Sequence, residues 1–220
     1  MKDFEKQRTD IVKHLGKIGY IKDPKIKKAM LKVKREQFVL PDYKQNAYVD
    51  MPLPIPGDAT ISALHMHAIF MSSVKLKAGD KVLEVGAGSG ILLAYIKEVV
   101  GSKGKVVGIE FTPETYEFAK KNLKKSGYEK KVKLILGDGS KGVPEESPFD
   151  KIIVSAACPE IPRPLIKQLK RGGILVAPVG GISSGQDLIY LEKTKKGETI
   201  RKNLGGVIFV PLVGRYGYKL

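Results

Sequence analysis

The sequence of 220 residues is poor in several residue types that carry specific chemistry. It contains one cysteine, no tryptophan and three histidines. The single thiol, Cys158, has no partner for an internal disulfide and no CxxC motif, and so few histidines and cysteines argue against a zinc site. No apolar run approaches the roughly 18 residues of a membrane-spanning helix, and the N-terminus lacks the apolar core of a signal peptide. These absences predict a cytosolic protein without membrane association.

The composition indicates a folded globular chain. Hydrophobic residues make up 42% of the sequence and charged residues 28%. This balance excludes disorder, a coiled coil and a collagen-like repeat. A chain of this length is most simply one large domain.

Acidic residues are scarce relative to basic ones. There are 39 lysines and arginines against 23 acidic residues, which gives a net charge of +16. Only six of the cations are arginines, although recognition of bases and phosphates favours the arginine fork. The lysines are spread along the chain among acidic residues. The pattern favours a solvated, heat-adapted surface over a nucleic-acid interface, but charge alone does not decide between them.

The N-terminal third predicts helices around an irregular segment. Apolar positions at helical spacing predict a helix over 3–18, and Pro24 opens a second one that runs to about residue 33. Prolines and glycines over 48–57 predict irregular structure. A further helix is expected over 62–73.

From residue 81 onwards the pattern changes to alternating strands and helices. Strands are predicted over 81–85, 105–110, 132–136, 151–155 and 174–178. Helices are predicted between them, over 89–100, 113–126 and 162–170, the last ending before Gly172 and Gly173. Such alternation is typical of a parallel sheet with helices on both faces.

The C-terminal residues predict antiparallel strands. Segments 187–192 and 198–201 flank a turn and form a hairpin, and an apolar strand is expected over 206–213. The predicted fold is an α/β, Rossmann-like, doubly wound sheet with a helical cap and an antiparallel edge. We interpret it as one domain, made of a cap and substrate loop over 1–75, a cofactor-binding core over 76–180 and C-terminal strands over 181–220.

A glycine-rich loop follows the first strand of the core. Gly86, Gly88 and Gly90 allow positive φ angles and a close approach of a ligand to the backbone. The dinucleotide fingerprint would need a glycine at Ile91, and the lysine of a phosphate-binding P-loop is absent. On its own the loop is also compatible with a purely structural turn.

Two acidic residues extend the pattern. Glu110 ends the second strand, where an acid can accept hydrogen bonds from ribose hydroxyls, and Asp138 follows the third strand. Both lie at the carboxyl edge of the predicted sheet, beside the glycine loop. Two acids disfavour a pyrophosphate and suit a nucleoside that carries a positive centre, such as S-adenosylmethionine.

Taken together, these segments resemble the protein-L-isoaspartate O-methyltransferase family over nearly the whole chain. The glycine loop is shared by many methyltransferases, whereas residues 60–62 and 209–212 are far more specific. The resemblance is carried by residues 47–53, 60–67, 82–90, 137–139, 148–153, 168–173 and 209–214. It implies that S-adenosylmethionine methylates the free α-carboxylate of L-isoaspartyl residues in damaged proteins and leaves as S-adenosylhomocysteine. The ester then closes to a succinimide, whose hydrolysis restores some normal aspartate.

The residue chemistry is compatible with that reaction. A carboxylate is ionised at neutral pH, so its methylation needs alignment and exclusion of water rather than a general base. Hydroxyl groups can orient a carboxylate without neutralising it. Ser62 and Thr60 are the candidate catalytic residues, and the resemblance places the family's essential serine at Ser62. The alternative is that one of them caps the following helix.

The other candidate residues divide into two groups. The cofactor-binding candidates are Glu84, Gly86, Ala87, Gly88, Ser89, Gly90, Glu110, Asp138 and Gly139. The substrate candidates are Asp50, His65 and Val207, for which the alternatives are loop capping, a packed histidine and an ordinary core strand. Asp58, Leu64 and Ile91 depart from the family's common pattern and put the fine shape of the substrate pocket in question.

Three other functions were weighed. A nucleic-acid methyltransferase would fit the net charge, but the chain has Ser-Ala-Ala-Cys-Pro over 155–159 where an amino-methylating enzyme usually has Asp-Pro-Pro-Tyr. A non-catalytic binding module would lose the hydroxyls of Thr60 and Ser62. A dehydrogenase is disfavoured by the spacing at Gly90. We therefore expect isoaspartyl proteins and peptides as partners, no nucleic acid or membrane, and a monomer, although the sequence does not fix the oligomeric state.

Overall fold

A helical cap precedes the sheet in the computed structural model, which describes residues 3–219. The cap consists of α1 (Phe4–Lys17), α2 (Pro24–Lys32) and two short 3-10 helices, η1 (Arg35–Gln37) and η2 (Pro41–Asn46). Both predicted helices are confirmed. The Asp3 carboxylate accepts hydrogen bonds from N–H groups at the start of α1, and Asp23 does the same for α2.

One seven-stranded sheet forms the core. Its order is β5-β4-β3-β6-β7-β8-β9, parallel from β5 to β7 and antiparallel from β7 to β9. The strands are β3 (Lys81–Val85), β4 (Lys105–Glu110), β5 (Lys133–Leu136), β6 (Phe149–Val154), β7 (Leu169–Gly181), β8 (Gly185–Lys193) and β9 (Thr199–Val207). The doubly wound parallel sheet with an antiparallel edge is therefore confirmed.

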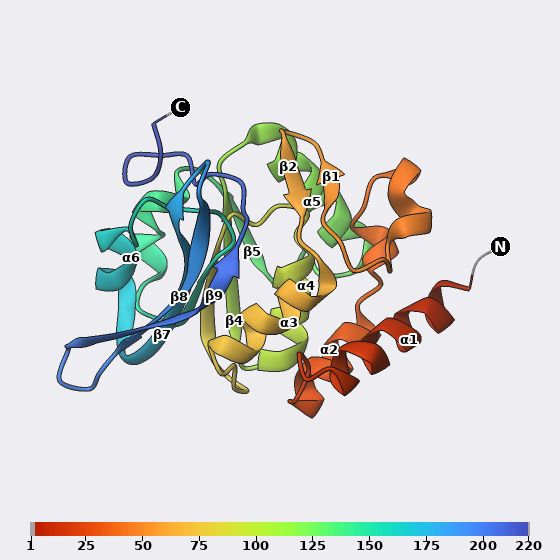
Figure 1. Cartoon of the computed structure of the whole chain (residues 1–220), viewed down its shortest axis with the longest axis horizontal. Helices are drawn as coiled ribbons and strands as arrows, with labels where there is room; N and C mark the ends of the chain where they lie inside the picture. The colour runs from red at the N-terminus through yellow and green to blue at the C-terminus, as the bar shows by residue number, and fades with distance from the viewer. Residues whose placement is uncertain (1–2, 220) are drawn as a thin grey trace.

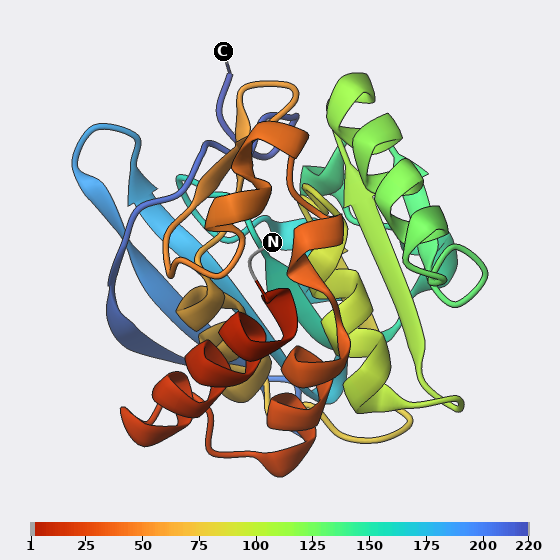
Figure 2. The same ribbon diagram turned by 90° about the vertical axis from the view of Figure 1, so that its right-hand side faces the viewer.

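Helices cover both faces of this sheet. α3 (Leu64–Ser73), α4 (Ile91–Val100) and α5 (Pro113–Lys125) pack with the cap on one face, in a cluster that includes Val82 of β3. α6 (Arg163–Gln168) packs on the other face, in a cluster that includes Leu83 and Val85. Alternate residues of β3 thus point to opposite layers. Figure 1 shows α6 on the far side of the sheet from the cap, and Figure 2 looks onto the cap helices.

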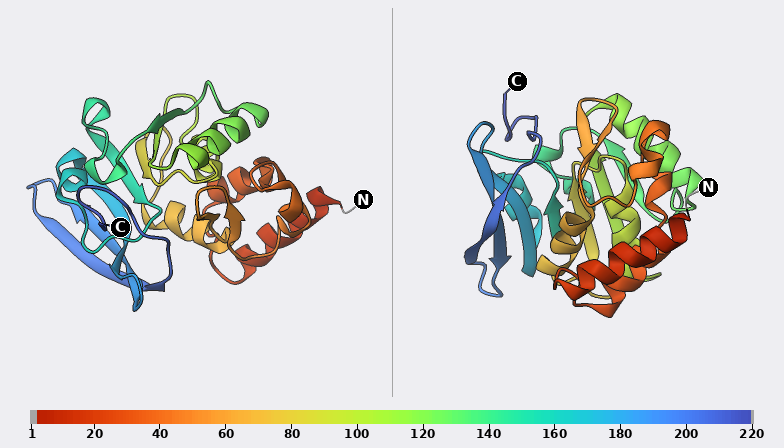
Figure 3. Two further views of the ribbon diagram at one scale, coloured as in Figure 1. Left: turned by 90° about the horizontal axis from the view of Figure 1, so that it is seen from above. Right: turned by 45° about the vertical axis from the view of Figure 1, so that its right-hand side comes forward.

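The cap and the C-terminal strands lie at opposite ends of the molecule, as the view from above in Figure 3 shows. Among the helices of residues 3–219, none combines the length and the apolar character needed to cross a bilayer.

The Pro-rich segment is more regular than its composition predicts. Instead of irregular structure throughout 48–57, β1 (Leu53–Ile55) pairs antiparallel with β2 (Ala59–Ile61). This two-stranded sheet tolerates Pro54 because each strand has a free edge, where a missing N–H costs no ladder hydrogen bond. Gly57 at φ +81° and Asp58 at φ +52° make the turn between the strands.

Two boundaries near the C-terminus also differ from the prediction. The strand expected over 206–213 is wrong, because β9 ends at Val207 and the chain then leaves the sheet to hydrogen-bond with Ala157 in the loop after β6. α6 ends at Gln168, and β7 already starts at Leu169 rather than after the glycine pair. A register shift opposite Phe149 accommodates that early start.

The cap is held together by a buried polar cluster around Tyr48. The Tyr48 hydroxyl accepts hydrogen bonds from the Arg35 N–H at 3.2 Å and from Arg8 Nη1 at 3.3 Å, and it donates to Glu36 Oε2. Arg8 also lies 3.7 Å from Glu36 Oε1. One hydroxyl therefore connects α1, η1 and the segment after η2. Burial, followed by the hydrogen bond to Glu36, raises the pKa of Tyr48, so the group stays neutral.

We expect Tyr48→Phe to lower the free energy of unfolding by about 1–3 kcal/mol, since it leaves buried donors and an acceptor without their partner. Urea denaturation followed by circular dichroism measures this change. Tyr43→Phe, which alters a tyrosine of η2 without a side-chain hydrogen bond among residues 3–219, is the matched control. Equal stability of the two variants would contradict the structural role of the Tyr48 hydroxyl.

Candidate active site

The glycine loop makes the turn between β3 and α4. Gly86, Gly88 and Gly90 have φ angles of +83°, +54° and +83°. The Gly90 N–H donates to the Ala87 carbonyl at 2.8 Å, and α4 begins at the next residue. The positive φ favours glycine at Gly90, and a Cβ there would lie 3.1 Å from Leu123 Cγ on α5, which is a crowded contact.

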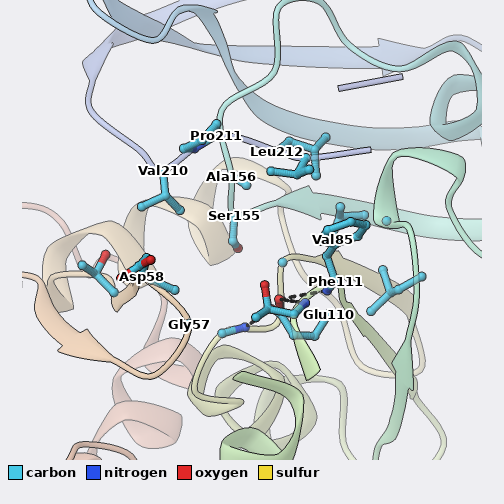
Figure 4. A pocket seen from close by; sticks show the side chains of 18 residues that line it. Gly57, Asp58, Val85, Glu110, Phe111, Ser155, Ala156, Val210, Pro211 and Leu212 are labelled. Atoms are coloured by element: carbon cyan, nitrogen blue, oxygen red, sulfur yellow. Dashed lines mark hydrogen bonds between the residues drawn. The ribbon is translucent and has the colours of Figure 1, made fainter. Parts of the chain in front are cut away.

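Glu110 connects this loop to the next one. Its Oε2 accepts from the Gly88 N–H at 2.9 Å, and its Oε1 accepts from the N–H groups of Phe111 at 2.9 Å and Thr112 at 3.1 Å. Figure 4 shows this carboxylate at the edge of the pocket. Oε1 already accepts two hydrogen bonds, whereas Oε2 accepts one and keeps a second lone pair for a ligand hydroxyl.

A cleft of about 520 Å³ opens above these loops. Its walls come from five parts of the chain: the β1–β2 hairpin, the ends of β3 and β4, the loop after β5, the loop after β6 and the segment over 210–213. Figure 4 shows Asp58, Glu110, Ser155 and Val210 around it. The predicted residues that line this cleft are Thr60, Gly86, Gly88, Glu110 and Gly139.

A small polar recess of about 30 Å³ adjoins the cleft beneath the glycine loop. Glu84 lines it, with Oε1 accepting from the Ser155 hydroxyl at 3.1 Å and Oε2 buried without a hydrogen-bond partner in residues 3–219. Burial, followed by the charge of Glu110, raises the pKa of Glu84 well above its usual range, against the hydrogen bond from Ser155. The remaining predicted residues on the recess are Ser62, Ala87 and Ser89.

A second, more open cleft of about 600 Å³ lies next to the first. It is lined by Ser62 and His65 before and within α3, and by Val207 at the end of β9. Thr60 and Val210 line both large clefts, and Thr60 also lines the recess. Thr60 therefore lies where all three cavities meet, and Ser62 lies where the recess meets the open cleft.

The start of α3 decides between two interpretations of Ser62. The helix begins after Ala63, and neither Thr60 nor Ser62 provides a capping hydrogen bond. The capping alternative is therefore wrong for both residues. Asp50, in the Pro-rich loop, caps the helix instead, because its Oδ1 accepts a hydrogen bond from the His65 N–H. Its Oδ2 lies 3.0 Å from His65 Nδ1. Asp50 itself does not line the clefts, but it fixes His65, which does.

Asp138 is also placed behind the site rather than in its lining. Its oxygens accept from the Arg215 N–H at 3.0 Å and from both the N–H and the hydroxyl of Ser140, and Lys141 lies 3.5 Å away. Burial opposes ionisation, but these hydrogen bonds together hold the pKa of Asp138 below its usual value of 3.8. The next residue, Gly139, does line the cofactor-sized cleft.

Several lining residues were missed by the sequence analysis. Ser155 and Ala156 follow the fourth parallel strand, and Phe111 follows Glu110, so their position at the carboxyl edge of the sheet was a usable signal. Val210 and Leu212 gave no such signal, because they reach the cleft only by the return of the C-terminal segment. His67 lines the recess, and burial, then the charges of Arg35 and His65, lower its pKa well below 6.5.

The cavities fit a cationic nucleoside such as S-adenosylmethionine. The buried Glu84 oxygen without a partner faces the recess and would accept from a positively charged group. Glu110 lies at the end of the neighbouring strand, where an acid can accept from the sugar of the same ligand. The glycines leave the loop backbone open between them.

The fold and this site define a class of protein. A glycine loop after the first parallel strand, an acid at the end of the second and an antiparallel edge identify a Rossmann-like S-adenosylmethionine-dependent methyltransferase. Residues 6–217 match the family described as protein-L-isoaspartate(D-aspartate) O-methyltransferase. The chain belongs to this family.

Individual relatives agree with this assignment. A protein-L-isoaspartate O-methyltransferase of Methanopyrus kandleri is 47% identical over 218 residues, which cover 99% of this chain and 96% of the relative. A solved structure of a protein-L-isoaspartate O-methyltransferase has a TM-score of 0.87 at 33% identity and covers 96% of this chain and 67% of its own. A Plasmodium falciparum structure described as a complex with S-adenosyl-L-homocysteine has a TM-score of 0.83 at 30% identity, covering 94% and 98%.

The position of Asp138 predicts a pH dependence of stability. Its pKa is lower in the folded than in the unfolded chain, so its hydrogen bonds contribute stability that is present above the unfolded pKa and is lost as the pH falls through the folded pKa. We therefore expect the wild type to exceed Asp138→Asn in stability most at about pH 5–7, with the difference shrinking towards about pH 2. Urea titrations at several pH values measure it. Asp42→Asn, at an exposed position of η2, should show no such trend, and a constant difference for Asp138→Asn would contradict the assignment.

Proposed function

We propose that this chain transfers a methyl group from S-adenosylmethionine to the free α-carboxylate of L-isoaspartyl residues in damaged proteins and peptides. The observation that carries the proposal is that a nucleoside-sized cleft meets an open cleft at Thr60, with Ser62 lining both the recess and the open cleft. Membership of the isoaspartate methyltransferase family supports the choice of acceptor. The buried thiol of Cys158 suits a reducing compartment, and we place the enzyme in the cytoplasm.

The residues around the first cleft hold the cofactor. S-adenosylmethionine supplies, when bound, a methyl group on a cationic sulfonium. Glu110 accepts from a ribose hydroxyl through the free lone pair of Oε2, and Glu84 faces the positively charged amino acid end from the recess. Ala87, Ser89 and Gly90 keep the loop in shape between Gly86 and Gly88, and Gly139 forms the opposite wall. Asp138 acts as a positioning residue that fixes Gly139 and the segment behind it.

The acceptor needs alignment rather than deprotonation. An α-carboxylate is already ionised near neutral pH, so a general base would add nothing. The Ser62 hydroxyl makes no hydrogen bond among the described residues and is free to donate to the acceptor carboxylate, with Thr60 beside it. Two neutral donors orient the carboxylate without pairing its charge, which leaves its second oxygen nucleophilic.

The open cleft receives the polypeptide around the isoaspartyl residue. His65 forms its floor and is held in place by Asp50. Val207 ends β9, whose outer edge has no strand partner in the seven-stranded sheet. An extended peptide can therefore enter beside this edge with its carboxylate towards Ser62.

The proposal is tested with radiolabelled S-adenosylmethionine and two peptides that differ only in Asp against L-isoAsp. We expect base-labile methyl ester on the isoaspartyl peptide alone, because the proposed acceptor is a free α-carboxylate, which the isoaspartyl residue has and the Asp residue of the other peptide lacks. Label on neither peptide, with cofactor binding intact, would mean that the cofactor site is right and the acceptor is wrong. RNA would then be the next acceptor to test.

We expect Ser62→Ala to lower kcat by about a hundredfold, as loss of one positioned donor does elsewhere, while the Kd for S-adenosylhomocysteine changes less than about twofold. Steady-state methylation of the isoaspartyl peptide and calorimetric titration give the two values. Glu110→Gln is the reciprocal variant, since it disturbs the cofactor side and should raise that Kd by about tenfold. Unchanged transfer in Ser62→Ala would remove Ser62 from the active site.

A further inference from the structure

A separate groove lies at the junction between the cap and the core. It has a volume of about 250 Å³ and is formed by the end of α2 and η1 on one side and by the end of α5 and the loop after it on the other. None of the residues that line it in the described chain lines the two clefts or the recess. Methyl transfer therefore makes no use of this groove.

The groove is strongly basic. Lys32, Lys34, Lys125 and Lys131 line it, and no carboxylate is among its described lining residues. Lys32 is paired with Glu98 at 2.7 Å, and the Lys131 ammonium lies 4.9 Å from the centre of the Tyr128 ring. Within residues 3–219, Lys34, Lys125 and Lys131 have no carboxylate oxygen within ion-pair distance. Three cations are thus left for an external anion.

Neighbouring lysines strengthen the positive field. Burial and the charge of Lys44 lower the pKa of Lys125, and burial and the charge of Lys131 lower the pKa of Lys97. Both shifts mean that cations lie close enough to repel one another. A bound anion would relieve that repulsion.

Opposing charges are too few to cancel this field. α2 and α5 both end at the groove, and a helix C-terminus carries about half a negative charge. The two helix ends and the Glu98 carboxylate together carry about two negative charges. They therefore offset about two of the six lysine charges in and beside the groove, those of Lys32, Lys34, Lys44, Lys97, Lys125 and Lys131. Lysines in a last helical turn often only complement the helix dipole, but here Lys34, Lys44 and Lys131 lie outside both helices.

We propose that this groove binds a phosphate-bearing anion with at least two phosphate groups. Lysine acts as a point-charge ligand for phosphate and does not need the bidentate geometry of arginine. The side-chain amide of Gln37 in the lining adds a hydrogen-bond donor beside the ammonium groups. An acidic polypeptide fits less well, since Val33 is the single aliphatic residue among the described lining.

The test is calorimetric titration of the full chain with tripolyphosphate at low salt. We expect binding that weakens by about tenfold to a hundredfold in the double variant Lys34→Gln/Lys125→Gln, because two of the unpaired charges are removed. The control is Lys195→Gln/Lys196→Gln, which has the same net charge and alters exposed lysines in the turn between β8 and β9. The control variant should bind as the wild type does. Circular dichroism checks that both variants are folded.

A second titration with oligouridylate distinguishes the two sources of phosphate. Loss of both ligands in Lys34→Gln/Lys125→Gln supports a site that also accepts a phosphodiester chain, and loss of tripolyphosphate binding alone supports a small free anion. Three results would overturn the proposal: equal weakening in both double variants, which is the effect of net charge alone; a penta-aspartate peptide that binds as tightly as tripolyphosphate; or no binding of either phosphate ligand.

The methylation assay separates this proposal from the proposed function. Lys34→Gln/Lys125→Gln should methylate the isoaspartyl peptide at the wild-type rate, because it alters no residue of the clefts. Binding of tripolyphosphate by a chain that methylates neither peptide would leave the groove established and the proposed function refuted.

Discussion

The Glu110 carboxylate is the interaction on which the site depends. Its three hydrogen bonds connect the glycine loop after β3 to the turn after β4, so the two loops that would enclose a nucleoside cannot move independently. Close packing of α4 on β4 also holds these two loops in place. A Cβ at Gly108 would lie 2.6 Å from Leu93 Cδ1, which shows how closely α4 lies against β4. The position of the cofactor cleft thus follows from one carboxylate and two glycines, Gly90 and Gly108.

The remaining wall is supplied from far along the sequence. After β9 the chain returns across the loop that follows β6, where the Ala157 N–H donates to the Val210 carbonyl and the Leu212 N–H donates to the Ala157 carbonyl. Asp138 then accepts from the Arg215 N–H, 77 residues away. Gly214 must be glycine, because a Cβ there would overlap the Asp138 carboxylate. The C-terminal segment is therefore part of the active-site wall and not an appendage to the sheet.

These contacts explain what the sequence could and could not predict. The parallel core was predictable because each strand and helix has its own periodicity, and the carboxyl-edge positions of Glu110 and the glycine loop follow from strand order. The hairpin at Pro54 was not, since proline is excluded from sheets only where both edges are paired. The apolar run over 206–213 predicted a strand, but apolarity indicates burial and not the partner. Leu212 is buried and Val210 half-buried against a loop, while Ile208 of the same run is exposed, and no local pattern distinguishes this arrangement from a strand ladder.

The distribution of charge in the site follows from the acceptor. A negatively charged acceptor would approach cavities that contain Glu110 in the first cleft and Glu84 in the recess, and negative charge there would repel it. Burial, then the charge of Glu110, raises the pKa of Glu84 and so favours its neutral form. A cationic ligand would favour the ionised form of Glu84 and so balance the charge that it brings. Thr60 and Ser62, which line the open cleft, carry no charge, so an anion that entered there would be positioned by hydrogen bonds rather than attracted by an opposite charge.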